Sequence, residues 1–313
     1  MARAFVFPGQ GSQEVGMGRE LAEAFSVARE VFEEVDDALG MNLRRLMFEG
    51  PEAELQLTEN AQPALMGMSM AVLRVLRTEG NFEIGAKCAF VGGHSLGEYS
   101  ALTGAGAFSL GDAARILKVR GRSMQEAVPV GMGAMAALLG VELEMAEAIA
   151  KDAAQGGVCA AANDNAPGQI VISGDAAAVD RALAIAAERG FKRAIKLPVS
   201  APFHCALMQP AADQMAEILA ATKIAFPAVP VIANVTAMPS SDPDEIRRLL
   251  VQQVTSRVRW RECVLRMKDG GVDTIIEIGA GKVLTGLTKR IDRELMGMSV
   301  SSPADVEAVL KTL

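Results

Sequence analysis

A glycine-flanked serine gives this sequence its clearest chemical signal. Ser95 lies in the pentapeptide GHSLG at 93–97, between the short apolar run 88–91 and a helix-like segment at 98–102. Strand, Gly-x-Ser-x-Gly and helix together are typical of a nucleophile elbow, a strained turn that exposes the serine hydroxyl at the end of a sheet. Backbone N–H groups at the helix start then face any negative charge that develops nearby. The pattern favours a nucleophilic Ser95 over a tight turn that merely exposes a serine.

A nucleophilic serine needs a base, and the chain has only two histidines, His94 and His204. His94 adjoins Ser95, and neighbouring side chains on a strained turn diverge, which leaves His204. Ser200 and Pro202 are start signals for a helix, so we expect His204 in its first turn. The helix dipole would there disfavour the imidazolium and suit a neutral base. A packed surface histidine is the alternative interpretation.

An arginine stands on the wrong face of a predicted helix. This helix should follow the N-cap Ser109 and end near Ala127, with apolar residues on one face and Arg115, Lys118 and Arg122 on the other. Arg120 falls on the apolar face. An unpaired buried charge is costly, so the guanidinium must meet acceptors. A structural salt bridge, a side chain that reaches the rim and a site for an anionic substrate are all compatible with this position.

Composition narrows the class of protein. The chain has 313 residues, of which 50% are hydrophobic and 4% aromatic, and a net charge of −7 that argues against nucleic acid as a partner. No apolar run reaches the roughly 18–20 residues of a membrane span. The N-terminus shows no secretory pattern, so we expect a cytoplasmic protein without a membrane partner. Four cysteines lack metal-ligand spacing, and no metal site is expected.

The order of predicted elements indicates an α/β protein with a mostly parallel sheet. Strands expected at 4–7, 88–91 and 274–278 alternate with helices. Between about 130 and 197 the pattern changes to β-α-β-β-α-β, which is typical of a ferredoxin-like unit. We therefore expect a large subdomain from 1–128 and 199–313, interrupted by a small ferredoxin-like subdomain at 129–198. The tail from 296 to 313 predicts a turn and a short helix.

Five motifs connect these residues to a known family. They are PGQGSQ at 8–13, GHSLGE at 93–98, Arg120-Gly121, PFHCALM at 202–208 and GKVLTGL at 281–287. In this order they closely resemble the malonyl-CoA:acyl carrier protein transacylases of bacterial fatty acid synthesis. The resemblance runs from about residue 4 to about residue 292. The glycine-rich 279–282 within it also resembles a phosphate loop, but it lacks the required spacing and predicts a plain strand–helix turn.

The resemblance implies a hydrolase-like α/β core with a ferredoxin-like insert, and a role for six residues. Ser95 corresponds to the nucleophile, His204 to the general base, the backbone N–H groups of Gln10 and Leu96 to the oxyanion hole, Arg120 to the group that binds the malonyl carboxylate, and Gln253 to the residue whose backbone carbonyl orients the histidine. It further implies malonyl-CoA and phosphopantetheinylated acyl carrier protein as substrates, ping-pong kinetics and no bound cofactor. We expect a monomer.

Two further expectations concern selectivity and docking. Phe203, beside the base, is bulky enough to crowd the α-methyl group of methylmalonyl, although packing explains it equally well. An acidic carrier should dock near the mouth of the cleft on basic residues, the candidates being Lys192, Arg193, Lys196, Lys282, Lys289 and Arg290.

Three other functions remain open at this stage. The first is a serine thioesterase or esterase, in which an acid lies between Ser95 and His204 in the chain. The aspartates that qualify by position are Asp112, Asp152, Asp164, Asp175 and Asp180. The second is a catalytically silent scaffold that docks a carrier. The third is an acyltransferase that serves a polyketide pathway with the same chemistry and a different carrier.

Overall fold

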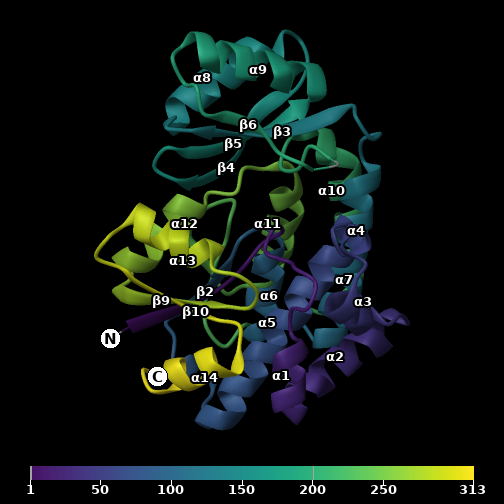
Figure 1. Cartoon of the computed structure of the whole chain (residues 1–313), viewed down its shortest axis with the longest axis vertical. Coiled ribbons are helices and arrows are strands. Elements are labelled where there is room, and N and C mark those ends of the chain that lie inside the picture. Colours follow the sequence, from purple (N-terminus) through teal and green to yellow (C-terminus); the bar gives the residue numbers. More distant parts are fainter. Residues whose placement is uncertain (1, 200) are drawn as a thin grey trace.

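The structure, a computed structural model, describes residues 2–199 and 201–313 as an α/β protein built on two sheets (Figure 1). The larger sheet has six strands in the order β10-β9-β1-β2-β7-β8. These strands are β1 (Ala2–Phe7), β2 (Phe90–Gly93), β7 (Val231–Ile232), β8 (Pro239–Ser240), β9 (Val272–Ile278) and β10 (Met296–Val300). All neighbouring strands are parallel except β7 and β8. The predicted α/β class is confirmed.

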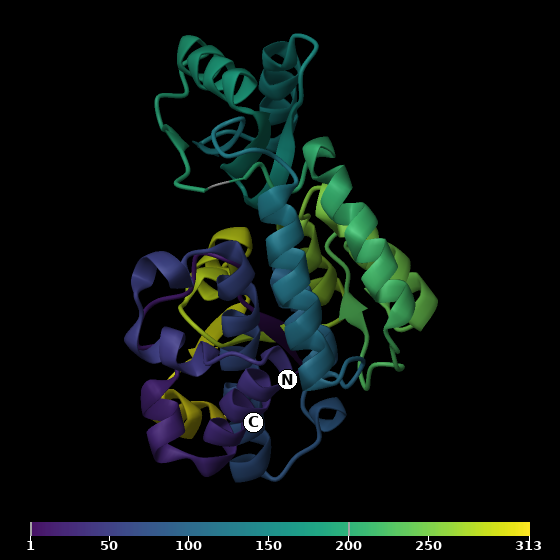
Figure 2. The same cartoon turned by 90° about the vertical axis from the view of Figure 1, so that its right-hand side faces the viewer.

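Helices cover this sheet and form most of the larger unit. They are α1 (Arg19–Ala24), α2 (Ser26–Leu39), α3 (Leu43–Glu49), α4 (Glu52–Leu55), α5 (Thr58–Gly80), α6 (Leu96–Gly104), α7 (Leu110–Glu126), α10 (Gln209–Ala221), α11 (Pro243–Thr255), α12 (Trp260–Asp269), α13 (Val283–Ile291) and α14 (Pro303–Leu310), with the 3-10 helices η1 (Ile84–Ala86) and η2 (Ala206–Met208). Figure 2 shows α7 running down the middle of the molecule from below the smaller sheet, with α10 and α11 packed against each other beside it.

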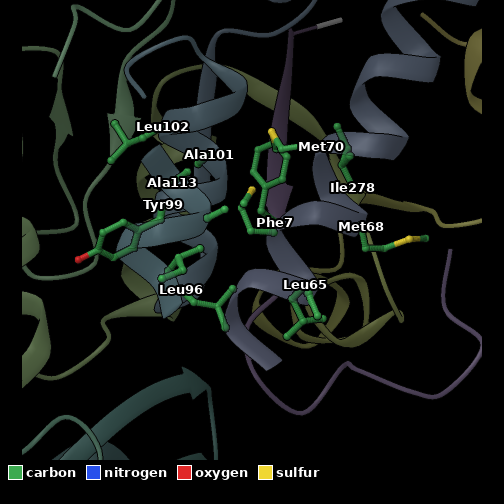
Figure 3. Packing of buried hydrophobic residues seen from close by; sticks show 14 of the residues in the cluster. Phe7, Leu65, Met68, Met70, Leu96, Tyr99, Ala101, Leu102, Ala113 and Ile278 are labelled. Atoms are coloured by element: carbon green, nitrogen blue, oxygen red, sulfur yellow. The ribbon is translucent and has the colours of Figure 1, made fainter. Parts of the chain in front are cut away.

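Strand β1 shows why both faces of the large sheet are covered. Successive side chains of a strand point to opposite faces. Phe5 and Phe7 therefore pack into the core formed with α2, α5, α6 and α7, whereas Ala4 and Val6 pack with α12 and α13. Figure 3 shows Phe7 between residues of α6 and α5. A parallel sheet buried on both faces fixes the carboxyl ends of β1 and β2, and the loops that follow them, against a rigid support.

The smaller sheet lies apart from the larger one, at one end of the molecule (Figure 1). Its elements are β3 (Gly133–Leu139), α8 (Leu143–Ala154), β4 (Cys159–Ala166), β5 (Gln169–Asp175), α9 (Ala176–Glu188) and β6 (Ala194–Lys196). The strands pair antiparallel in the order β4-β5-β3-β6. Ala136, Leu138 and Ile172 face α8 and α9 in a separate core. The opposite face, which includes Met135, is turned toward the larger unit.

One strand ties the two units together. In β4, Asn163 forms a parallel bridge with Val258, and the N–H of Asp164 donates to the carbonyl of Val258 at 2.9 Å. Arg261 of α12 reaches the buried carboxylate of Asp164 at 3.1 Å. These contacts join the edge of the smaller sheet to the larger unit.

The C-terminal end of the chain differs from the sequence expectation in one element and agrees with it in another. The tail from 296 to 313 contains strand β10 as well as helix α14, so the prediction of a turn and a helix alone is wrong. The strand was missed because its glycine and methionines do not alternate clearly with polar residues. The loop 279–282 is a plain strand–helix turn, since the buried carboxylate of Glu277 accepts the N–H groups of Leu284 and Thr285 at 3.0 and 2.7 Å. The N–H groups at the start of α13 are thus already bound by the carboxylate of Glu277.

Among the described residues, no helix is both long and apolar enough to cross a bilayer.

Candidate active site

The turn that carries Ser95 is strained and depends on close backbone approaches. Ser95 connects β2 to α6 with φ 54° and ψ −108°, a left-handed backbone that costs a side-chain-bearing residue about 1–3 kcal/mol. A Cβ on Gly93 would lie 2.0 Å from the carbonyl of Gly97, and a Cβ on Gly97 would lie 2.2 Å from the carbonyl oxygen of Phe7. Only glycine at both positions lets the elbow sit this close to β1.

His204 is not in a helix, so the prediction that it occupies a first helical turn is wrong. It precedes η2 and holds a left-handed backbone with φ 60°, while Ser200, the predicted N-cap, lies outside the described residues. The signals at 200–202 misled because the helix begins several residues later. The N-terminal dipole therefore does not explain a neutral imidazole, and another cause is needed.

The contacts of His204 determine which nitrogen carries its proton. Nδ1 lies 2.9 Å from the backbone carbonyl oxygen of Gln253, and Nε2 lies 2.8 Å from Oγ of Ser95. A carbonyl oxygen only accepts hydrogen bonds, so in the neutral ring the proton is on Nδ1. Nε2 is then free to accept from the hydroxyl. This is the tautomer that a general base acting on Ser95 requires.

Burial keeps His204 neutral. Its side chain is 5% exposed, and desolvation lowers its pKa to about 3, with the positive charge of Arg120 as the next cause. The Nδ1–H bond to Gln253 opposes these effects and raises the pKa. The imidazole is thus held in the form that takes a proton from a hydroxyl.

Arg120 is buried on the apolar side of α7, as its position in the sequence predicted, and it meets oxygen acceptors. The guanidinium is 1% exposed, and its Nη1 donates to Oε1 of Gln62 at 2.8 Å. Its Nη2 donates to Oε1 of Gln253 at 2.9 Å and to Oγ of Ser95 at 3.1 Å. Burial lowers the pKa of Arg120.

The guanidinium also retains binding capacity. No carboxylate forms a direct ion pair with it among the described residues, and its Nε has no hydrogen-bond partner there. Its Cζ lies 5.4 Å from the centre of the Tyr99 ring, a favourable cation–π distance. A charge held only by amides, a hydroxyl and an aromatic face is suited to receive an anion that arrives with the substrate.

One cavity of about 900 Å³ between the two units of the protein is lined by Ser95, His204, Arg120 and Gln62. Gln10 and Leu96 also line it, and within the described chain neither backbone N–H donates to a protein acceptor. Both N–H groups therefore remain available for an oxygen beside Ser95. The wall formed by the smaller unit includes Met135 and Leu197. No group of three or more histidine, cysteine, aspartate or glutamate side chains is arranged for a metal ion in the part of the chain that the structure describes.

The other histidine and the candidate acids have partners of their own. His94 lines the same cavity, but its Nε2 contacts Oδ1 of Asn165 at 2.8 Å. The five aspartates that a hydrolase triad could use are partnered respectively by Arg115, Arg189, Arg261, the N–H of Val158 and Lys196. The acceptor for His204 is a backbone carbonyl instead.

Sequence reasoning missed two polar residues of the site. Gln62 is a buried amide in the apolar helix α5, and the same helical-face test that selected Arg120 would have found it. Asn234 follows β7 and accepts the N–H of Ser95 through Oδ1 at 2.8 Å, while its Nδ2 donates to the carbonyl of Gly93 at 2.8 Å. No local pattern in the sequence marks Asn234, because its partners lie far away in the chain.

Comparisons with known proteins identify the family of this chain. Residues 4–308 match the family described as acyl transferase domain. The malonyl CoA-acyl carrier protein transacylase of Bacillus subtilis is 48% identical over 311 residues, which is 99% of this chain and 96% of that protein. The crystal structure of an acyl-carrier-protein S-malonyltransferase from Bartonella henselae is 55% identical and superposes with a TM-score of 0.97, covering 100% of this chain and 99% of the other.

A third relative was solved together with a carrier. It is a malonyl-transacylase in complex with a type II PKS acyl-carrier protein, 43% identical with a TM-score of 0.96 and full coverage of both chains. The resemblance seen in the sequence motifs is confirmed by these matches. The chain is an acyltransferase and belongs to the family of malonyl CoA-acyl carrier protein transacylases.

Proposed function

We propose that this enzyme moves a malonyl group from malonyl-CoA to the phosphopantetheine thiol of an acyl carrier protein, through an ester on Ser95. One observation carries the proposal: Oγ of Ser95 lies within hydrogen-bond distance of both His204 Nε2, at 2.8 Å, and Arg120 Nη2, at 3.1 Å. A base and a buried cation at one hydroxyl suit a nucleophile whose acyl group carries its own negative charge.

The first half-reaction forms the acyl-enzyme. Nε2 of His204 takes the proton from the Ser95 hydroxyl while Oγ attacks the thioester carbonyl. The N–H groups of Gln10 and Leu96 donate to the oxygen that becomes negative in the tetrahedral intermediate. The C–S bond then breaks, the imidazolium returns its proton to the sulfur, and CoA leaves as a thiol. The carbonyl of Gln253 holds the ring in place through Nδ1.

The second half-reaction reverses these steps with another thiol. The phosphopantetheine thiol of the carrier gives its proton to Nε2 of His204 and attacks the malonyl ester. The bond from the acyl carbon to Oγ breaks, and Ser95 recovers its proton from the same imidazole. Because both thiols use one site in turn, the kinetics should be ping-pong.

Arg120 selects the acyl group on this proposal. In the resting site its N–H groups are held by the amide oxygens of Gln62 and Gln253, which are neutral acceptors. A malonyl carboxylate offers a charged two-oxygen acceptor that a planar guanidinium binds better than single amides. Acetyl lacks this group, and so it gains nothing from the buried charge.

The finer description of the fold is also part of this proposal. Residues 129–198 would form a ferredoxin-like subdomain inserted into a hydrolase-like core of 1–128 and 199–313, which the chain order β3-α8-β4-β5-α9-β6 supports. We also propose that the monomer is active without a bound cofactor, because the steps above use only Ser95, His204, Arg120 and backbone groups that meet at one cavity. The six basic residues expected to dock the acidic carrier are all exposed and remain candidates, namely Lys192, Arg193, Lys196, Lys282, Lys289 and Arg290.

A polyketide carrier is the second candidate acceptor. It is favoured by the relative that was solved with a type II PKS acyl-carrier protein. The chemistry at Ser95 would be unchanged, and only the docked protein would differ. Comparing transfer to a fatty acid carrier and to a polyketide carrier distinguishes the two.

The experiment that tests the function follows the acyl group by mass spectrometry. The enzyme is incubated with malonyl-CoA alone, and we expect a stable malonyl adduct on the peptide that contains Ser95. Addition of phosphopantetheinylated carrier should move the adduct to the carrier thiol. Ser95→Ala is the control and should carry no adduct. Release of free malonate at the same rate with and without the carrier would identify a thioesterase and contradict the proposal.

A further inference from the structure

A buried carboxylate that takes no part in the proposed chemistry lies directly behind the site. Glu98, in the first turn of α6, is 2% exposed. Its Oε2 accepts the side-chain amide of Gln253 at 2.8 Å and the backbone N–H of Asn234 at 2.9 Å. Burial raises the pKa of Glu98 to about 7, and these two donors and the charge of Arg120 lower it. Burying an ionisable carboxyl group is costly unless hydrogen bonds compensate it, so these contacts of Glu98 are needed to keep it here.

The contacts of Glu98 fix which way the amide of Gln253 faces. Nε2 of Gln253 donates to Glu98 at 2.8 Å and also lies 3.1 Å from the carbonyl of Ser95. With the nitrogen held on that side, Oε1 must face the other way, where it accepts from Arg120 at 2.9 Å. A flipped amide would point N–H groups at the guanidinium and lose both bonds. Among the described residues, Glu98 provides the shortest of the bonds that prevent this flip and the only one to a carboxylate.

Gln253 contacts both His204 and Arg120. The backbone carbonyl of Gln253 receives Nδ1–H of His204, while its side chain receives Arg120. Glu98 also accepts the backbone N–H of Asn234, and the side chain of Asn234 in turn accepts the N–H of Ser95. Loosening the side chain of Gln253 would release Arg120 and the carbonyl of Ser95 directly. It would reach His204 through the backbone of Gln253.

We propose that Glu98 is a positioning residue for acyl transfer, which acts through the amide of Gln253 to hold His204 and Arg120 at the hydroxyl of Ser95. The inference rests on the proposed function. Glu98 transfers no proton on this proposal. Its carboxylate anchors Gln253, whose backbone carbonyl takes the place of the acid that usually orients a catalytic histidine.

The test measures the initial rate of Ser95 acylation by malonyl-CoA in a rapid-mixing experiment and divides it by the concentration of enzyme that forms the adduct, which gives a rate constant per active site. This division removes any loss that is due to unfolded protein. We expect Glu98→Ala to lower the rate constant per active site about tenfold or more, because misplaced catalytic groups cost this much. Glu98→Gln keeps an oxygen at the same place without the charge, and it should cost only about threefold to fivefold.

Glu277→Gln is the matched control. Glu277 is also a fully buried glutamate that accepts backbone N–H groups, but its contacts are at the start of α13. This variant should lose stability and keep the wild-type rate constant per active site. A comparable rate loss in Glu277→Gln would make the effect of Glu98 a general consequence of disturbing a buried carboxylate and would overturn the inference.

A double-mutant cycle separates positioning from a merely structural role. Gln253→Ala keeps the backbone carbonyl and removes the amide through which Glu98 is proposed to act. In this background Glu98→Ala should lower the acylation rate by less than about twofold, because coupled residues are not additive. An undiminished effect there would contradict the inference.

If Glu98→Ala does not fold, Glu98→Gln decides alone, and a wild-type rate constant in that variant overturns the proposal. Failure of the proposed function gives a different result from failure of this inference, because the wild-type enzyme would then form no malonyl adduct on Ser95.

Discussion

Ser95 and His204 lie 109 positions apart in the chain, meet at 2.8 Å between Oγ and Nε2, and both hold a left-handed backbone, with φ 54° and 60°. Such a conformation costs each residue about 1–3 kcal/mol, and it persists only where the surroundings fix it. For Ser95 the fixing comes from the elbow packed on β1. For His204 it comes from Gln253 and the burial of the ring. Fixing both strained residues keeps the proposed nucleophile and the proposed base within hydrogen-bond distance of each other.

Replacement of Arg120 should separate malonyl from acetyl transfer. Loss of a buried two-pronged bond to a carboxylate should lower kcat/KM for malonyl-CoA by roughly 100- to 1,000-fold. Acetyl-CoA carries no carboxylate, so its transfer should stay the same or improve. Steady-state kinetics of Arg120→Ala with both substrates measure the change. Arg115→Ala, on the exposed face of the same helix, is the control and should alter neither. Equal losses for the two substrates would exclude this role for Arg120.

The pH dependence of acylation should reflect the low pKa of His204. Burial and the charge of Arg120 lower this pKa to about 3, so the ring remains neutral and able to accept a proton well below its ordinary pKa of 6.5. We expect the acid limb of the acylation rate to lie far below pH 6.5. The Arg120→Ala variant, assayed with acetyl-CoA, should show this limb at higher pH because one lowering cause is gone. A wild-type midpoint near 6.5 would show that the imidazole is solvated.

The same pKa shift has a consequence for stability. Below pH 6.5 the unfolded chain binds a proton at His204 that the folded protein does not bind. The free energy of unfolding should therefore fall as the pH decreases from 6.5 toward 3, by about 1.4 kcal/mol per pH unit from this group. The contribution is fully present above pH 6.5. Chemical denaturation of wild type and His204→Ala across this range measures it as the difference between the two slopes.

Phe203 should restrict the acyl group at its α-carbon. The ring is 8% exposed, adjoins His204 and lines the cavity. A Phe203→Ser variant should accept methylmalonyl-CoA better relative to malonyl-CoA, by roughly tenfold, since one methyl group in a tight pocket is worth about 1–3 kcal/mol. Competition between the two substrates gives the ratio directly. An equal decrease for both would assign Phe203 to packing alone.

Gly97 should tolerate no side chain. A Cβ there would lie 2.2 Å from the carbonyl oxygen of Phe7, so Gly97→Ala must move the elbow away from β1. We expect a loss of more than about 2 kcal/mol in unfolding free energy and of Ser95 acylation. Gly286→Ala is the matched control, because Gly286 lies inside α13 with nothing within 4 Å of the added Cβ. That variant should be stabilised by about 0.5–1 kcal/mol in the same denaturation experiment.

The sequence alone determined the parts of this protein that local patterns encode. The strand, glycines and helix around Ser95 predicted an elbow, and the misplaced charge of Arg120 on an apolar helix face predicted its burial. These inferences succeeded because a residue's neighbours at fixed spacing decide which face it occupies. The scarcity of histidine selected His204, although not its backbone conformation, because cap and proline signals are equally compatible with a loop.

Only the tertiary structure decided how the polar groups pair. Arg120 meets Gln62 across 58 positions and Gln253 across 133, and Gln253 meets Glu98 across 155. Motif resemblance implied the backbone carbonyl of Gln253, but nothing local to it indicates that its side chain lies between a carboxylate and a guanidinium. Hydrogen bonds between distant segments depend on how whole helices pack, and that packing follows from the burial of many apolar residues together rather than from any short stretch of sequence.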